Sequence, residues 1–220
     1  MPNFARMVID LHTHTAPKSY DALQSPMELI LEAKALGLDA VCLTEHDAFW
    51  DDRDIQELRR HHKLIILPGC EINTDKGHFL AFGLREYLFG MHKFTFLHDQ
   101  VNKAGGVLVA AHPYRRRQIT DSTATRITPE LALVSKEETF GYMDAIEGLN
   151  GRGSEAENNF SQMLSRILNI KTTGGSDSHR PGDLGTFATE FDSSITSISG
   201  LVREIKSGRF RPITLDHGSP

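Results

Sequence analysis

Two histidines separated by one residue stand near the start of the chain, in the segment VIDLHTHT at positions 8–15. The apolar residues before them are typical of a β-strand, in which side chains alternate between two faces with a period of two residues. His12 and His14 therefore point to the same side from the same end of one strand, where two imidazoles could share a metal ion. The segment alone leaves open the alternative that both histidines only form hydrogen bonds at a polar strand end.

Residues of the same types stand at the ends of most other apolar segments. Such residues end four of these segments and begin a fifth: His46, Glu71, His112, and the pair Asp177 and His179 end segments, and His78 begins one. The other five histidines fall in a helix end, a polar connection and the tail, and we interpret them as surface or capping residues: His61, His62, His92, His98 and His217. Burying six imidazoles and two carboxylates together without a metal would carry a large desolvation cost. The pattern therefore predicts a metal centre.

The elements that must position these residues alternate along the chain between strands and helices. Helices are predicted at 26–36, 51–62, 95–104, 155–168 and 201–206, the first with Ser25 as N-cap and Glu28 completing a capping box. Strands are predicted between them, with a hairpin across 74–77. This alternation favours mostly parallel strands, hence a doubly wound sheet or a barrel. In a parallel barrel the carboxyl ends of the strands share one face, where barrel enzymes place their active sites. His78 fits this face if its strand returns antiparallel.

Composition limits the class of protein. The 220 residues suit one domain spanning 1–220, and 39% hydrophobic residues suffice for a core. The net charge of −5 argues against an extended duplex nucleic-acid surface, which needs clustered cations. No segment is apolar and long enough for a membrane span or a secretory leader. Cys42 and Cys70 lie in apolar segments and give no disulfide framework, so we expect a reducing, cytoplasmic setting.

Five motifs together resemble those of the PHP family, the polymerase and histidinol phosphatase superfamily. They are DLHTHT, LTEHD, PGCEINTDKGHFLAFG, AAHPYR and GGSDSH, and LGTFATEF and EIKSGRFRP in the tail also resemble the short, stand-alone members. The resemblance covers almost the whole chain. It implies a distorted (β/α)₇ TIM-like barrel, a centre of two or three metal ions at the C-terminal face, and hydrolysis of phosphoesters.

The resemblance also implies a set of ligands for each ion. His12, His14, Asp177 and a bridging Glu71 would hold the first; Asp21, His46 and His179 the second; His78, His112 and again Glu71 the third. Only the resemblance supplies Asp21, which by itself would be interpreted as a loop or capping acid. Glu71, His112 and Asp177 are expected to be the catalytic members. Two departures from the family pattern are TEH where many relatives have TDH, and YDA where many place glycine after the aspartate.

A mixed set of nitrogen and oxygen ligands favours Zn, Mn or Fe over Mg or Ca. A divalent ion lowers the pKa of a bound water toward ~7, and two ions can hold the resulting hydroxide and stabilise displacement at phosphorus. The substrate phosphate is anionic, so we expect cations around it. The candidate contacts are Arg115, Arg116, Arg117, Arg180 and, more weakly, Asn150. Each arginine could equally be a solvated surface residue, and Asn150 a plain turn residue.

The expected activity is therefore that of a metal-dependent phosphoesterase (phosphatase or phosphodiesterase). Its substrate would be a small phosphorylated molecule, a nucleotide or an oligonucleotide end. One alternative is an amidohydrolase-type hydrolase, which also begins with two histidines after its first strand but would use a bridging lysine where this chain has Glu71. A second alternative is a non-catalytic domain that binds metal or a partner, although no ligand has been lost.

Overall fold

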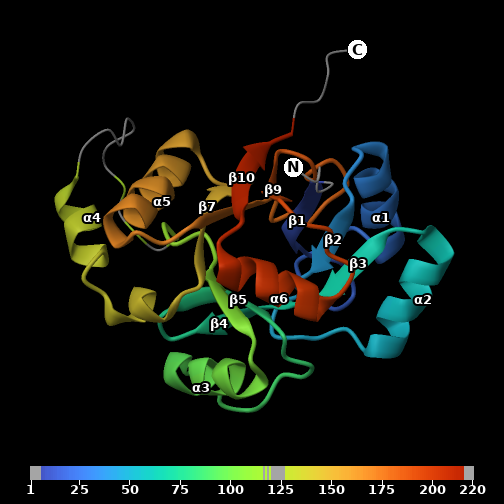
Figure 1. Cartoon of the computed structure of the whole chain (residues 1–220), viewed down its shortest axis with the longest axis horizontal. Helices are drawn as coiled ribbons and strands as arrows, with labels where there is room; N and C mark the ends of the chain where they lie inside the picture. Colours follow the sequence, from blue (N-terminus) through green and yellow to red (C-terminus); the bar gives the residue numbers. More distant parts are fainter. Residues whose placement is uncertain (1–5, 116, 118, 120–126, 216–220) are drawn as a thin grey trace.

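The structure is a computed structural model, and it describes residues 6–115, 117, 119 and 127–215. Ten strands form two five-stranded sheets in the orders β10-β9-β1-β2-β3 and β4-β5-β6-β7-β8 (Figure 1). The strands are β1 (Met7–Thr13), β2 (Ala40–Leu43), β3 (Ile65–Pro68), β4 (Cys70–Thr74), β5 (Gly77–Phe82), β6 (Val107–Ala110), β7 (Ala145–Asn150), β8 (Thr172–Gly175), β9 (Phe187–Phe191) and β10 (Phe210–Thr214). The helices are α1 (Pro26–Ala35), α2 (Asp52–His62), α3 (Phe94–Ala104), α4 (Pro129–Val134), α5 (Glu155–Leu168) and α6 (Ile198–Ser207), with a 3₁₀-helix at Glu138–Tyr142.

Strand directions are more mixed than the sequence predicts. The pairs β1–β2, β2–β3, β6–β7 and β7–β8 are parallel. The pairs β1–β9, β9–β10, β4–β5 and β5–β6 are antiparallel. The expectation of mostly parallel strands is therefore wrong, because the hairpin strand β5 and the two C-terminal strands run against their neighbours. The hairpin itself forms as predicted, with Thr74 opposite Gly77.

The two sheets meet where the chain crosses from β3 to β4 at Gly69. A side chain there would collide with the Phe82 ring, since a Cβ would lie 2.6 Å from it. Single β-bridges, from Thr13 to Ser178 and from His46 to Glu71, also link the two sheets. Over the residues that the structure describes, the strands form no continuous closed sheet. The observed fold is thus a mixed α/β fold with two sheets, which is a coarser statement than the predicted barrel.

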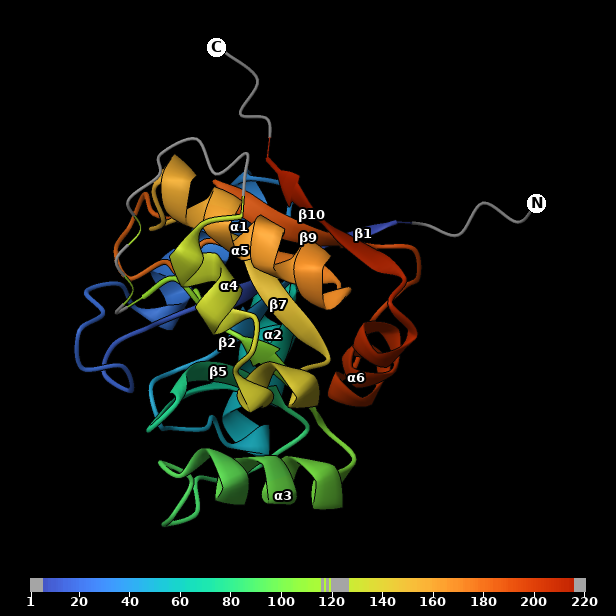
Figure 2. The same cartoon turned by 90° about the vertical axis from the view of Figure 1, so that its left-hand side faces the viewer.

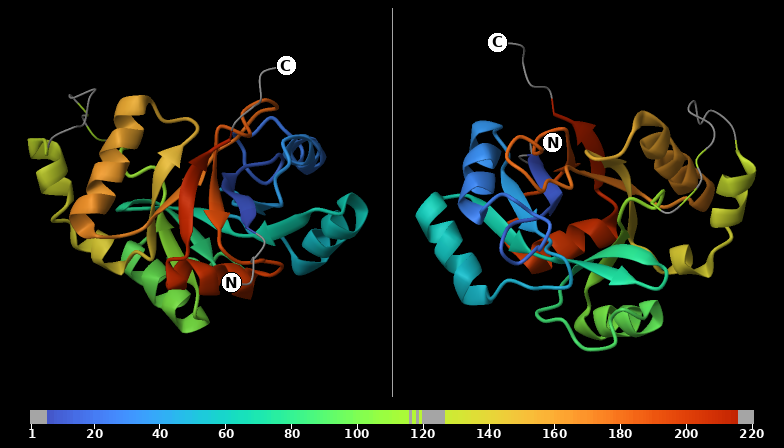
Figure 3. Two further views of the ribbon diagram at one scale, coloured as in Figure 1. Left: turned by 45° about the horizontal axis from the view of Figure 1, so that its top comes forward. Right: turned by 180° about the vertical axis from the view of Figure 1, so that it is seen from behind.

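Helices surround the strands. Figures 1 and 3 show α1 and α2 on one side, α4 and α5 on the opposite side and α3 beneath, and Figure 2 shows α6 beside the strands. The α1 helix begins with the predicted capping box between Ser25 and Glu28, and its buried face places Leu29 and Ile30 against apolar residues of β2 and β3. Removing a buried leucine of this kind costs about 2–5 kcal/mol. The packed helices therefore fix the strand ends that carry the site.

Both cysteines lie free in the interior, as expected. No helix formed by the described residues is long and apolar enough to cross a membrane.

Candidate metal centre

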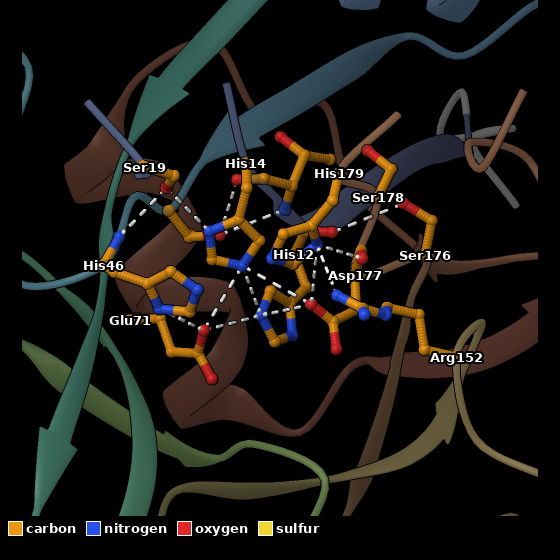
Figure 4. A network of polar contacts seen from close by, with 12 residues as sticks. His12, His14, Ser19, His46, Glu71, Arg152, Ser176, Asp177, Ser178 and His179 are labelled. Atoms are coloured by element: carbon orange, nitrogen blue, oxygen red, sulfur yellow. Dashed lines mark hydrogen bonds and ion pairs between the residues drawn. The ribbon is translucent and has the colours of Figure 1, made fainter. Parts of the chain in front are cut away.

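The structure brings all nine predicted ligands together. They come from strand ends on both sheets, and Figure 4 shows several of them converging. His12 lies on β1, Glu71 on β4 and His78 on β5. The remaining six follow strands or lie in loops: His14, Asp21, His46, His112, Asp177 and His179. Their roles as ligands stay predictions, but their convergence follows from the fold.

Three groups of side chains have the spacing that a metal ion requires. In each group one ligand atom per residue lies within 4.8 Å of the others, and the groups are His12–His14–Glu71–Asp177, His14–His46–His179 and Glu71–His78–His112. The first and third coincide with two of the predicted sets. In the second, Asp21 lies at the edge, with its carboxylate 3.3 Å from both His46 Nε2 and His179 Nε2. The arrangement can therefore hold several ions side by side.

Glu71 lies between the groups with no exposed surface. Its Oε1 is 2.8 Å from His78 Nδ1 and 2.7 Å from His112 Nε2. Its Oε2 is 3.2 Å from His14 Nε2 and 3.0 Å from His46 Nδ1. Each carboxylate oxygen thus faces a different group, which is the placement needed to bridge two metal positions.

The polar atoms of this cluster fit bound cations. Several buried atoms have no hydrogen-bond partner, and those at the cluster are Glu71 Oε2, Asp177 Oδ1, His179 Nε2 and His112 Nδ1. A buried polar atom without a partner costs about 1–3 kcal/mol, and more if it is charged. Carboxylate oxygens and imidazole nitrogens are the types of atom that coordinate Zn, Mn or Fe. The residues therefore fit a metal centre on their own geometry.

Charge interactions within the cluster shift its pKa values strongly. Burial alone would lower the pKa of His12, but Glu147, Asp177 and Glu71 outweigh it and raise that pKa well above its usual value. Burial would raise the pKa of Glu71, but His12 and His112 outweigh it and hold that pKa well below its usual range. Burial and then the charge of His14 lower the pKa of His179 to about 4. Within the cluster, attraction between His12 and the buried carboxylates thus opposes the effect of burial on both.

Metal uptake should consequently release protons. A ligand histidine must be neutral, whereas the raised pKa of His12 favours its protonated form before metal binds. The pKa of His179 is lowered to about 4, so that ring is already neutral and releases nothing. We expect about one proton or more per chain on Zn²⁺ binding, and an apparent affinity that rises with pH until the pKa of His12 is passed. Calorimetric titration in buffers of different ionisation enthalpy measures this number, and zero released protons would contradict the assignment of His12.

A second carboxylate, Glu147, supports the ligands from behind. Its Oε1 lies 2.9 Å from His12 Nδ1, and its Oε2 accepts hydrogen bonds from the backbone N–H of His112 at 2.9 Å and from Asn150 Nδ2 at 3.0 Å. Partners of this kind fix the tautomer and orientation of a ligand histidine. Sequence reasoning missed Glu147, although a carboxylate inside the apolar run DAIEGLN was an available signal.

The predicted substrate contacts have different surroundings. Asn150 has no exposed surface, and its side-chain amide donates hydrogen bonds to Glu147 and Asp177, so in this structure it contacts these two carboxylates. Arg115 Nη2 lies 2.7 Å from Asp177 Oδ2 at the edge of the centre. Arg117 forms a two-pronged ion pair with Glu137.

The last two predicted contacts give less structural information. Arg180 is exposed, and its backbone N–H donates a hydrogen bond to the Asp183 carboxylate. Arg116 lies outside the described residues.

Sequence reasoning also missed Arg152, which follows β7. Its Nη1 lies 2.9 Å from His179 Nδ1 (Figure 4). The signal for it was its place two residues after Asn150, in the turn that ends a strand pointing at the centre. Arg115 and Arg152 thus supply positive charge next to the ligands.

A cleft opens beside the third group. It is lined by His78 and His112 together with cationic, acidic and apolar residues, which include Lys76, Phe79, Arg115, Arg117, Glu137 and Phe140. An anionic molecule could therefore approach the ligands from this side.

Two family models match the chain. The model described as the PHP domain matches residues 10–170, and the model described as PHP-associated matches residues 155–210. The first match contains the strand ends that carry His12 to His112, and its 161 positions are more than half of the 220 residues.

Solved structures share the fold at low sequence identity. PsfC from Pseudomonas syringae has a TM-score of 0.66 and 20% identity, covering 96% of this chain and 92% of its own. A candidate metal-dependent phosphoesterase from Bifidobacterium adolescentis has a TM-score of 0.60 and 18% identity, covering 91% and 96%. An amidohydrolase from Chromobacterium violaceum, solved with sulfate and no metal, has a TM-score of 0.62 and 16% identity, covering 95% and 98%. At these sequence identities the similarity shows the fold alone.

Proposed function

This chain belongs to the PHP domain family, and from that premise we propose that it is a metal-dependent phosphoesterase. The observation that carries the proposal is Glu71, whose two oxygens face different ligand groups within one buried cluster. Two or three divalent ions of Zn, Mn or Fe would be held by the nine convergent residues. A carboxylate at the bridging position, in place of the lysine expected of an amidohydrolase, favours phosphoester hydrolysis over that alternative.

Bound ions would supply Lewis-acid stabilisation of the charge that develops at phosphorus and would make a nucleophilic water more acidic. The protein's own residues hold the ligands in place. Glu147 orients His12, and Asn150 and Arg115 together bond to Oδ2 of Asp177. The Oδ1 atom of Asp177 faces the ligand cluster, 3.5 Å from a ring nitrogen of each of His12, His14 and His179.

Phosphate recognition is assigned to two arginines, Arg115 and Arg152. Guanidinium groups bind phosphate oxygens with two parallel hydrogen bonds, and both of these groups lie beside ligand residues. Arg115 is paired with Asp177. Burial alone would lower the pKa of Arg115, but the attraction to Asp177 outweighs burial and raises that pKa. The cation therefore stays charged and fixed at the edge of the cluster.

Arg115→Ala should lower kcat/KM for a phosphorylated substrate by about 10- to 100-fold. This range corresponds to the about 1.5–3 kcal/mol of a hydrogen bond to a charged group. Steady-state kinetics measure it, with Arg85→Ala as the matched control because the Arg85 side chain is 87% exposed and pairs with the surface residue Asp52. Equal kcat/KM values in the two variants would contradict a role of Arg115 in phosphate binding.

The substrate is proposed to be a small phosphorylated molecule, a nucleotide or the end of an oligonucleotide. The test is phosphate release from monoesters, nucleoside bisphosphates and short oligonucleotides by protein loaded with Mn²⁺ or Zn²⁺, beside a set of amide and lactone substrates. Release from at least one phosphoester, lost on chelation, is the expected result. Turnover of the amides or lactones alone would favour the amidohydrolase alternative instead.

A further inference from the structure

Glu45 precedes His46 and belongs to none of the three ligand groups. It is completely buried, and its carboxylate accepts hydrogen bonds from the backbone N–H of Thr15 at 2.8 Å and from Trp50 Nε1 at 2.9 Å. The hydroxyls of Thr15 and Ser19 also donate to it. A buried charge without a cationic partner is costly unless hydrogen bonds stabilise it. Here four donors do so, and three of them belong to the segment that leads to Asp21.

Ser19 connects this carboxylate to the ligands. Its Oγ lies between three groups: Glu45 Oε2, His14 Nδ1 at 3.0 Å and the backbone N–H of His46 at 3.2 Å (Figure 4). A hydroxyl has one proton to donate, and an ionised carboxylate can only accept. The Ser19 proton therefore goes to Glu45, and the Ser19 oxygen accepts from His46 N–H and from His14 Nδ1–H.

This hydrogen-bond pattern fixes the tautomer of His14. With the proton on Nδ1, the lone pair of Nε2 points at the cluster, 3.2 Å from Glu71 Oε2 and 3.5 Å from Asp177 Oδ1. His14 is also the residue that the first and second ligand groups share. Its orientation consequently affects two metal positions at once.

The same contacts hold the loop that carries Asp21. Thr15 and Ser19 are joined by a backbone hydrogen bond of 2.9 Å, and both donate to Glu45. Asp21 follows two residues later, with its carboxylate 3.3 Å from His46 and His179. The geometry points to Glu45 as a positioning residue that acts through Ser19 on His14 and on the Asp21 loop. This inference rests on the metal centre of the proposed function.

The test measures metal binding, which is independent of turnover. Ser19→Ala removes the hydroxyl and leaves the bonds from Glu45 to Thr15 and Trp50 intact. We expect its Zn²⁺ affinity, measured by competition with a chromophoric chelator, to fall about 10- to 100-fold, as is typical for partners of metal ligands. Long-range ¹H–¹⁵N spectra of the Zn²⁺-loaded protein should show His14 protonated on Nδ1 in the wild type and lose that signature in the variant.

Ser161→Ala is the matched control, because Ser161 is equally buried but donates to the Glu157 carbonyl within α5, away from the centre. Trp50→Phe removes one donor to Glu45 without touching Ser19, so its affinity should stay near that of the wild type. An affinity unchanged in Ser19→Ala, or lowered equally in Ser161→Ala, would overturn the positioning role.

The outcomes also separate this role from the proposed function. Lower affinity in Ser19→Ala, with no phosphate release by the wild type, would support the role of Glu45 and Ser19 and refute the phosphoesterase. Phosphate release by the wild type, with unchanged Zn²⁺ affinity in Ser19→Ala, would support the phosphoesterase and refute the role of Glu45 and Ser19. A wild-type protein that binds no Zn²⁺ would refute both.

Discussion

Glu71→Gln should remove more than one bound ion per chain and nearly all turnover. The side chain has no exposed surface, and each of its oxygens faces a different ligand group. Glutamine keeps the size but is neutral and replaces one oxygen with an NH₂ that cannot coordinate a cation. It also removes a negative charge that offsets repulsion between neighbouring dications. Two positions should therefore weaken together, which elemental analysis after dialysis measures directly, with kcat falling by at least about 100-fold.

Asp21→Asn provides the comparison within the same centre. The Asp21 side chain is 39% exposed and, among the ligands, lies 3.3 Å from His46 and from His179. We expect this variant to lose at most one ion and to regain activity at high metal concentration. If Glu71→Gln retains full metal content and near-normal turnover, the bridging role is wrong and the site must be rebuilt around Asp177.

The ligand set could be predicted because it depends on short-range periodicity. Alternation along a strand fixes the relation between His12 and His14, and a hairpin fixes the relation between Glu71 and His78. The hairpin register pairs Asn73 with His78 and Glu71 with Leu80, so the two ligands lie on neighbouring strands, two positions apart and on the same face. Each of these relations requires only a few consecutive residues and a known strand spacing.

The supporting carboxylates could not be predicted in the same way. Glu147 bonds to His12, which is 135 positions away, and Glu45 bonds to Ser19, which is 26 positions away. Such pairs depend on how strands from different parts of the chain are arranged in the sheets. A charged residue in an apolar segment signals that some partner exists, but the fold decides which one.

The same reason limits the prediction of the barrel. Strand and helix positions follow from local patterns, and α5 begins and ends where the sequence predicts, at Glu155 and Leu168. Strand direction and sheet closure depend on long-range pairing. Gly69 divides the apolar run at 63–72 (KLIILPGCEI) between β3 and β4, which belong to different sheets, and a Cβ at Gly69 would collide with Phe82. A local pattern shows one apolar run there, whereas the fold requires two strands.

Glu147→Gln is the second substitution with a large expected effect. Glu147 is nearly completely buried and accepts from the His112 backbone and the Asn150 amide while facing His12 Nδ1. Glutamine has one acceptor oxygen, so its NH₂ must face at least one of these donors. A buried donor left without a partner costs about 1–3 kcal/mol, and metal affinity should fall about 10- to 100-fold because His12 loses its orienting partner.

The number of protons released on Zn²⁺ binding shows whether Glu147→Gln acts through its lost charge or through altered packing. After burial, Glu147 is the largest influence on the pKa of His12, and it raises that pKa. In Glu147→Gln the pKa of His12 should fall, so fewer protons are released on Zn²⁺ binding at pH 7 than in the wild type. Glu190→Gln is the control, since Glu190 lies on β9 and pairs with Arg6 and Arg211 away from the centre. Weakened binding with an unchanged number of released protons would mean that Glu147 acts only through packing, and that another carboxylate keeps His12 charged.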